Sequence, residues 1–405
     1  MYRVIFFLLS FFSINIQPIY AQTQSVQIKT KLAFFSEQFL GVKNNLRYSN
    51  KGITKLDIKY DSKNSLSKLS LSYIEDGKYT LDGSYLQYTS GIITFGIGSI
   101  NRLWSFSNNT SLILSQNARP IESIYLKLEN KLKYNWLPSK ANWSFEVFNG
   151  FNDGALDSTK SMLLGARAIL SPYEGLDFEL IQTSQWGGKG YDSGISALSS
   201  ALLFDTNEGS NFNINKMAGF GISYTIPSQV IPLRIYGQAI GEDEAGNFPS
   251  CFAHLSGLEW TNKKIKYPSI IGIEAIDTRT GTSTHGYCGP NSIYNNSIYD
   301  YTNDGKTMGT AIDTEGTSVT LYLRSRISQK INIEFATKSV VINNNNWSGH
   351  RLSSKRQSGH INSLNASWKR RNIELNGNIN YHGFNLNKAK IKKGYGIGFS
   401  SSVIF

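Results

Sequence analysis

Short segments in which every second residue is apolar recur along the chain, and this pattern limits the possible fold more than any other feature. Typical apolar sets are Leu56, Ile58 and Tyr60; Leu69, Leu71 and Tyr73; Phe220, Ile222 and Tyr224; and Ile331, Ile333 and Phe335. Lys, Asp, Ser and Asn fill many of the intervening positions. Because successive side chains of a strand point to opposite faces, each segment has one apolar and one polar face. The pattern predicts an all-β protein.

The first residues have the features of a secretory signal peptide. Arg3 precedes an uncharged apolar run over residues 4–14, and Ala21 stands just before Gln22. A positive start, a short apolar core and a small residue at the cleavage site are typical of such signals. Eleven apolar residues fall well short of the roughly 20 that a membrane-spanning helix needs. We predict export and cleavage after Ala21.

The composition fits two kinds of exported β protein. Charged residues make up 17% of the chain and aromatic residues 13%, and there are 36 glycines. A membrane barrel has this composition because only every second residue of each strand faces lipid. A secreted soluble β protein can share it, so the choice depends on the pattern along the chain.

The end of the chain favours the membrane barrel. Alternation continues to the terminus through Tyr395, Ile397, Phe399, Ser401, Val403 and Phe405. In form this segment resembles the closing strand of bacterial outer-membrane proteins, whose terminal aromatic residue is read by the barrel assembly machinery. The alternative is an ordinary edge strand that ends the chain. We interpret Phe405 as an assembly signal.

Eighteen strands are predicted. They cover residues 42–48, 53–61, 66–74, 79–88, 91–99, 121–129, 142–150, 162–170, 176–184, 216–225, 231–239, 254–260, 269–277, 317–325, 330–338, 361–368, 373–381 and 394–405. An even number returns both ends of the chain to the periplasm, with short periplasmic turns and longer outer loops. The predicted inner connections do not exceed twelve residues, whereas the longest outer connection has 39.

This count predicts a transmembrane antiparallel β-barrel over residues 42–405, placed in the bacterial outer membrane with its loops at the cell surface. Residues 1–21 are the predicted signal peptide. Residues 22–41 are predicted to form a short periplasmic N-terminal segment outside the barrel, where a short helix could use Phe34, Phe35, Phe39 and Leu40 as apolar contacts.

We expect function on the outer loops, because binding residues concentrate on loops that a rigid scaffold carries. Trp186 offers a flat face to a sugar ring, and Glu242 and Asp243 could accept sugar hydroxyls. One loop combines stacking area with short hydrogen-bonding groups, and its candidate residues are Arg279, Tyr294, Asn296 and Tyr299. The alternatives are a membrane-girdle tryptophan and a solvated acidic turn.

Positive charge and two cysteines add further expectations. The net charge of +12 suits attraction to anions, which outside a cell are lipopolysaccharide phosphates and acidic glycans rather than nucleic acid. The outer loops at 350–360 and 388–393 are basic, and either anion fits them.

Cys251 and Cys288 fall in successive outer loops and are candidates for one disulfide. Two cysteines argue against a metal-thiolate cluster.

Catalysis has little support in the sequence. The five histidines do not fall at metal-ligand spacings. In residues 190–194 the serine stands one place away from the nucleophile-elbow position. No serine or carboxylate pair is singled out beside a base. We therefore predict a non-enzymatic protein without cofactor or metal.

A set of short blocks carries a resemblance to a known family. They lie at residues 101–104, 111–121, 164–167, 185–190, 236–238, 241–243, 257–260, 294–299 and 308–309. In order and spacing they resemble the Wzi-type capsule-assembly proteins of bacterial outer membranes. The chain departs from that family at residues 105–107, where the family has Gly-Pro-Gly, and at Asn296, where histidine is common.

The resemblance implies an eighteen-stranded outer-membrane lectin that binds exported capsular polysaccharide, or another surface glycan, on its outer face. Its other expected partners are outer-membrane lipid and lipopolysaccharide. The main alternative is a diffusion porin for small solutes, since an eighteen-stranded barrel is wide enough to hold water. A surface hydrolase is a third hypothesis.

Overall fold

The computed structural model describes residues 25–36, 40, 52–74, 77–130, 141–153, 160–188, 190–203, 214–226, 232–245, 248–262, 267–280 and 288–405. The predicted signal peptide at 1–21 and the predicted strand at 42–48 lie outside these ranges. The elements are β1 Ser25–Phe35, β2 Ile53–Asp61, β3 Ser65–Ile74, β4 Lys78–Thr80, β5 Tyr85–Ser90, β6 Ile93–Ser99, β7 Glu122–Asn130, β8 Asn142–Asn152, β9 Ser161–Tyr173, β10 Leu176–Trp186, α2 Ile195–Leu203, β11 Asn215–Thr225, β12 Leu233–Gly241, β13 Asp243–Ala245, β14 Phe248–Ser250, β15 Ala253–Asn262, β16 Ser269–Asp277, β17 Thr302–Asn303, β18 Lys306–Thr307, β19 Thr317–Arg326, β20 Ile331–Ile342, β21 Gln357–Arg370, β22 Ile373–His382 and β23 Gly394–Ile404.

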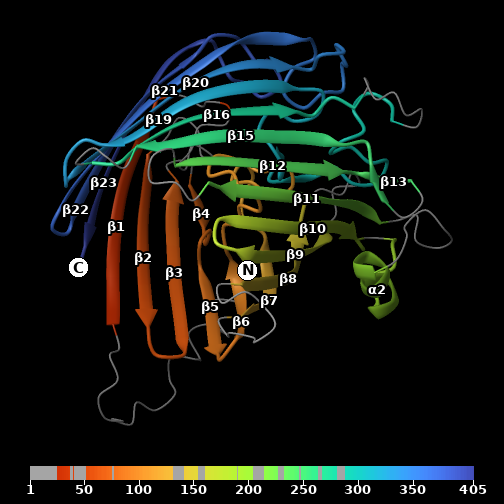
Figure 1. Ribbon diagram of the computed structural model, residues 1–405, viewed down its shortest axis with the longest axis horizontal. Helices are drawn as coiled ribbons and strands as arrows, with labels where there is room; N and C mark the ends of the chain where they lie inside the picture. Colours follow the sequence, from red (N-terminus) through yellow and green to blue (C-terminus); the bar gives the residue numbers. More distant parts are fainter. Residues whose placement is uncertain are drawn as a thin grey trace.

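The strands form one closed antiparallel barrel (Figure 1). Each strand pairs with its neighbours in the chain, and β1 pairs with both β2 and the last strand β23, which closes the sheet. Both β4 and β5 pair with β3, so they are two parts of one strand position. The barrel therefore has eighteen strand positions, as predicted. The pairs β13–β14 and β17–β18 are small hairpins outside it.

The first barrel strand lies earlier in the chain than predicted. Residues 22–41 were expected outside the barrel, but Ser25–Phe35 forms β1. Val26, Leu32 and Phe34 point outward and are exposed, whereas Phe35 is buried. The segment keeps the period-two alternation of a strand, so the expectation of a separate N-terminal segment is wrong for these residues.

The outer wall of the barrel is apolar. Exposed apolar side chains alternate with inward polar residues or glycines. The outward sets include Leu69, Leu71 and Tyr73; Ile93, Phe95 and Ile97; Phe178 and Leu180; Phe220, Ile222 and Tyr224; and Tyr395, Ile397 and Phe399. In water this belt would be costly, whereas in a bilayer it meets lipid chains. The predicted alternation, with apolar side chains on the outer face of the barrel, is confirmed. In the described part of the chain, no helix is both long and apolar enough to span a membrane.

The connections differ between the two ends of the barrel. One end, the turn end, carries the start of β1 and the end of β23, since the Ile28 N–H donates to the Phe405 carbonyl over 3.2 Å. It also carries short turns such as 174–175 and 371–372. The opposite end, the loop end, carries the long connections at 100–121, 187–214, 278–316 and 343–356. This asymmetry matches the prediction.

Candidate functional site

The connection between β6 and β7, residues 100–121, folds into the barrel and is named the plug. Trp104, Leu112 and Ile113 are buried in it. They join a core cluster with inward residues of the wall, including Ile181 of β10 and Ile276 of β16. A long connection that would otherwise extend from the loop end is thus part of the interior core.

Gln238 of β12 anchors the backbone of the plug. Its amide nitrogen donates to the Trp104 carbonyl over 2.7 Å, and its amide oxygen accepts from the Leu112 N–H over 2.8 Å. The same amide nitrogen donates to Glu179 over 3.0 Å, and Glu179 is paired with Arg167. The amide oxygen of Gln238 therefore binds the plug, and its amide nitrogen binds both the plug and the barrel wall.

Side chains on widely separated strands hold the plug. Arg102 donates to Glu146 of β8 over 2.8 Å, and Ser107 donates to Glu274 of β16 over 2.5 Å. Arg324 of β19 donates to the side chain of Asn109. Strands β8 and β19 are seven steps apart in the order β8, β9, β10, β11, β12, β15, β16, β19. The plug therefore crosses the lumen.

A glycine in the wall explains how one anchor is positioned. A Cβ at Gly257 would lie 2.2 Å from the Cζ atom of Tyr236, so only glycine leaves room for that ring. The Tyr236 hydroxyl then donates to Glu274 over 2.8 Å. The Glu274 carboxylate also accepts a hydrogen bond from Ser107 of the plug. Gly257 and Tyr236 therefore help to orient Glu274 toward the plug.

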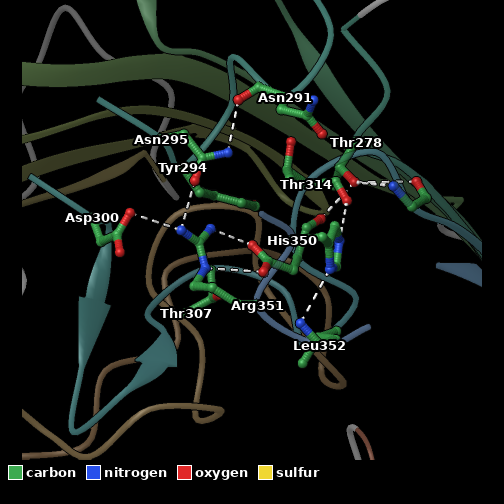
Figure 2. A network of polar contacts seen from close by, with 12 residues as sticks. Thr278, Asn291, Tyr294, Asn295, Asp300, Thr307, Thr314, His350, Arg351 and Leu352 are labelled. Atoms are coloured by element: carbon green, nitrogen blue, oxygen red, sulfur yellow. Dashed lines mark hydrogen bonds and ion pairs between the residues drawn. The ribbon is translucent and has the colours of Figure 1, made fainter. Parts of the chain in front are cut away.

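The connections 288–316 and 343–356 are bonded to each other and are named the cap, and Figure 2 shows part of the polar network between them. The cap is also bonded to the plug, through Tyr294 and Gly309. Its centre is Arg351, whose guanidinium makes two hydrogen bonds to Asp313, over 2.9 and 2.5 Å. The same guanidinium donates to Asp300 over 3.0 Å and to Asn295 over 2.6 Å. One arginine therefore joins two loops that are distant in sequence.

Burial and charge act together on the ionisable groups of the cap. Burial alone raises the pKa of Asp313, but the charge and hydrogen bonds of Arg351, with smaller contributions from His350 and the Thr314 backbone, together hold that pKa below its ordinary value. Burial raises the pKa of Asp300, against the opposing charge of Arg351. Arg351 therefore forms a tight ion pair with Asp313, and Asp300 is its second, weaker carboxylate partner.

His350 is fully buried in the cap. Its Nδ1 accepts from the Leu352 N–H over 3.1 Å, so Nε2 carries the hydrogen that it donates to the Thr314 carbonyl over 3.0 Å. Burial lowers the pKa of His350 below its ordinary value. The histidine is a neutral bridge between the two loops (Figure 2).

The predicted disulfide is present. Cys251 and Cys288 are bonded, with 5.4 Å between their Cα atoms. The bond joins the connection between β12 and β15 to the cap. Glu242, in the same connection as Cys251, accepts a hydrogen bond from the Tyr294 N–H. A covalent and a polar contact thus fix these two connections to each other.

Three predicted sugar-binding aromatic residues are buried. Tyr294 donates to the Leu112 carbonyl of the plug over 2.6 Å, and Tyr299 donates to the Gly187 carbonyl over 2.7 Å. Trp186 is 3% exposed, packs beside α2 and donates to Asn149 over 3.2 Å. Instead of the expected open faces, these rings lie in the packing that joins the loops to the barrel.

The other predicted binding residues lie closer to solvent or outside the described side chains. Arg279 is partly exposed and pairs with Asp277 over 2.6 Å. The Asn296 side chain accepts from the Ile298 N–H over 2.9 Å and so shapes a turn. Asp243 begins the small strand β13, and its side chain is outside what the structure describes. The structure joins Glu242 and Tyr294 but does not gather the six residues whose side chains it describes into one open site.

Sequence reasoning missed the plug, the Arg351 network and the exposed indole of Trp347. Arg351 was noted only as part of a basic stretch, because its partners Asp300 and Asp313 are distant in sequence. A run of small and apolar residues at 111–114 was the one available sign that the connection is not a solvated loop.

The chain matches the family model of the capsule assembly protein Wzi over residues 4–390. Over 216 residues it is 24% identical to an uncharacterized 55.8 kDa protein in the cps region of Klebsiella pneumoniae. That match covers 51% of the chain and 42% of the relative, so it spans less than half of the relative's length.

Several solved outer-membrane proteins share the fold. The Escherichia coli protein Wzi, described as a carbohydrate-binding β-barrel involved in group 1 capsule assembly, superposes with a TM-score of 0.75 at 19% identity, covering 93% of this chain and 84% of that one. Pseudomonas aeruginosa OccD3 gives a TM-score of 0.53 at 12% identity, covering 96% and 95%. OprD from the same organism gives 0.53 at 7% identity, covering 94% and 93%. The family model spans nearly the whole sequence, and the chain therefore belongs to the Wzi family of capsule assembly proteins.

Proposed function

We propose that this protein is a non-enzymatic outer-membrane barrel that binds capsular polysaccharide at the cell surface and helps to attach or organise it. The turn end would face the periplasm and the loop end the exterior, as expected for barrels with short inner turns and long outer loops. Family membership and the carbohydrate-binding E. coli relative support a saccharide ligand.

The observation that carries the proposal is the plug. Anchors on β8, β12, β16 and β19 hold it across the lumen, and the cap is bonded onto it from the loop end. A barrel filled in this way suits a rigid binding surface. The alternative function, a diffusion porin for small solutes, needs a water-filled path that the plug interrupts.

Within the proposed site, the buried candidates hold the loops in place rather than contact sugar. Trp186, Tyr294 and Tyr299 would act in this way, with Glu242 as their polar link. Arg279 and Asn296 keep partial exposure and remain proposed contact residues. Many weak contacts repeated along a polymer supply avidity without a deep pocket.

Two measurements on the purified full-length protein test this proposal. Binding to the capsular polysaccharide of the same bacterium, measured by biolayer interferometry, should be saturable and should be lost when the polymer is digested. In planar bilayers the protein should give no steady current. A large steady conductance together with no glycan binding would support the porin instead. Deletion of the gene should release capsule into the medium.

Lipopolysaccharide, membrane lipid and the barrel assembly machinery are proposed as further partners. The apolar belt supports contact with lipid. Phe405, 70% exposed at the turn end, stays a proposed assembly signal. Replacing Phe405 with Ser should lower the amount of folded barrel in the outer membrane without changing the glycan affinity of the molecules that fold.

A further inference from the structure

Two neighbouring loops at the loop end, residues 343–356 and 383–393, form one structural unit, which is named the basic loop pair. The Ala389 N–H donates to the Leu352 carbonyl over 3.2 Å. The Asn387 amide donates to the Ser354 hydroxyl over 3.0 Å, and its oxygen accepts from the Ser354 N–H over 3.3 Å. These bonds give the two loops a fixed relative position.

The inner side of the basic loop pair is apolar and packs on the barrel interior. Phe384, Leu386 and Ile391 are buried members of the core cluster that contains the plug, and Leu352 packs against it. The outer side carries six exposed cations, namely Lys355, Arg356, Lys388, Lys390, Lys392 and Lys393. The packing therefore directs positive charge away from the lumen.

No acidic residue compensates this charge within the two loops. Between Glu334 and the C-terminus the sequence contains one carboxylate residue, Glu374. It lies in β22 near the turn end and pairs with Lys29 over 3.0 Å. Like charges held close together without acids create a positive potential that attracts anions.

An exposed indole stands on the same unit. Trp347 is 37% exposed. Asn343 fixes its backbone, donating to the Trp347 carbonyl over 2.8 Å and accepting from its N–H over 2.8 Å. The indole lies against Gly349, where a Cβ would come within 2.4 Å of the ring. An indole face held in this way suits the C–H face of a sugar ring.

We propose that the basic loop pair binds an acidic saccharide chain, with Trp347 stacking on a sugar ring and the lysines pairing with its carboxylates. This inference rests on the proposed function and adds the charge class of the ligand. Lipopolysaccharide phosphate is the competing anion. The observations favour the saccharide, because the unit packs on the core inside the barrel rather than on its lipid-facing wall and carries an indole among the cations.

The test uses full-length protein in detergent micelles, with three probes: polygalacturonate, the same polymer after carboxyl reduction, and the surface polysaccharide of the same bacterium. The variant K390Q/K392Q/K393Q removes three cations from the loop pair. Its matched control, K369Q/R370Q/R371Q, removes three exposed cations at the opposite end of β21 and the following turn. A W347L variant tests the stacking contact.

We expect the loop variant to raise the Kd for polygalacturonate about fivefold to tenfold at low salt, as three exposed charge contacts are lost. The turn-end control should stay within about twofold, and high salt should abolish the difference. The reduced polymer should bind the loop variant and the wild type alike. W347L should weaken both polymers.

Other results would overturn the inference. If the wild type binds the surface polysaccharide but both triple variants behave alike, the acidic-ligand site is wrong while the proposed function stands. If the loop variant loses copurified lipopolysaccharide phosphate and keeps its saccharide affinity, the ligand is the lipid anion. If the wild type binds no saccharide probe, the proposed function fails as well.

Discussion

The Arg351 guanidinium faces the Asp313 carboxylate side by side, with Nε to Oδ2 at 2.9 Å and Nη2 to Oδ1 at 2.5 Å, and Asp313 is only 1% exposed. This two-bond geometry fixes direction as well as distance. Asp313 lies in the connection that follows β16, and Arg351 lies in the connection that follows β20. The ion pair therefore holds the two loops of the cap together.

Replacing Asp313 with Asn should loosen the cap. The change leaves the largely buried guanidinium with only its Asp300 carboxylate, which costs about 2–3 kcal/mol of local opening free energy. Hydrogen exchange of the cap peptides should therefore accelerate while the barrel strands remain protected. The control is D304N, an exposed acid of the same loop with φ 54°, a conformation that asparagine tolerates. Equal exchange in both variants would contradict the structural role of Asp313.

The cap should also loosen as the pH falls from about 7 to 5. Because the folded pKa of His350 is lowered, its contribution is complete above the unfolded value of about 6.5 and is lost as the pH falls toward the folded pKa. Protonation of Nδ1 removes the acceptor of the Leu352 N–H. The charged groups that act on His350 are Asp313, Arg351 and Lys388.

The measurement for His350 is hydrogen exchange of a peptide containing Leu352 at pH 7 and pH 5, corrected for intrinsic rates. We expect protection to fall in the wild type. H350Q should be less protected at pH 7 and should show little further change at pH 5. Asp313 does not contribute in this window, since its lowered pKa places its loss of stability below about 3.8. A wild type with equal protection at both pH values would refute the assignment.

The sequence predicted the barrel well because the wall depends on local chemistry. Sets such as Phe220, Ile222 and Tyr224 must alternate to face lipid, and the ladder between β10 and β11 follows from that alternation. The first strand was misplaced because Thr30 interrupts its outward apolar set and Phe34 and Phe35 are adjacent. The paired phenylalanines suggested helix contacts, whereas in the structure one faces outward and one inward.

The candidate site was harder to predict because its contacts join segments far apart in the chain. Tyr294 and Tyr299 lie in a loop whose composition is typical of sugar binding. In the structure, however, their hydroxyls donate hydrogen bonds to the backbone carbonyls of residues 112 and 187. Whether a loop aromatic is open or buried depends on where the other loops fold. The disulfide was predictable, since the alternation of turns and loops placed both cysteines at one end.

Removing the disulfide should affect the loops and spare the barrel. In a free chain such a bond contributes about 2–4 kcal/mol, and less here because the flanking strands already hold both connections. C251S/C288S should keep the heat resistance of the folded barrel on gels but lose protease resistance between β16 and β19. The matched control is S250A/S292A, which changes two neighbouring small side chains. Unchanged proteolysis would show that the bond adds nothing to the cap.

Gln238 offers the most direct test of the plug. Replacing it with Leu leaves the Leu112 N–H without its partner. It also takes one partner each from the Trp104 carbonyl, which keeps Ser111, and from Glu179, which keeps Arg167. A buried unpaired group such as the Leu112 N–H costs about 1–3 kcal/mol. The plug should then detach transiently, so Q238L should give brief current openings in planar bilayers where the wild type gives none. The control, Q182L, removes an amide that contacts α2 on the outer wall. Both variants lose one glutamine from the same wall, from β12 and from β10, with β11 between them. Only detachment of the plug predicts openings in Q238L alone, and silent traces from Q238L would contradict its role as an anchor.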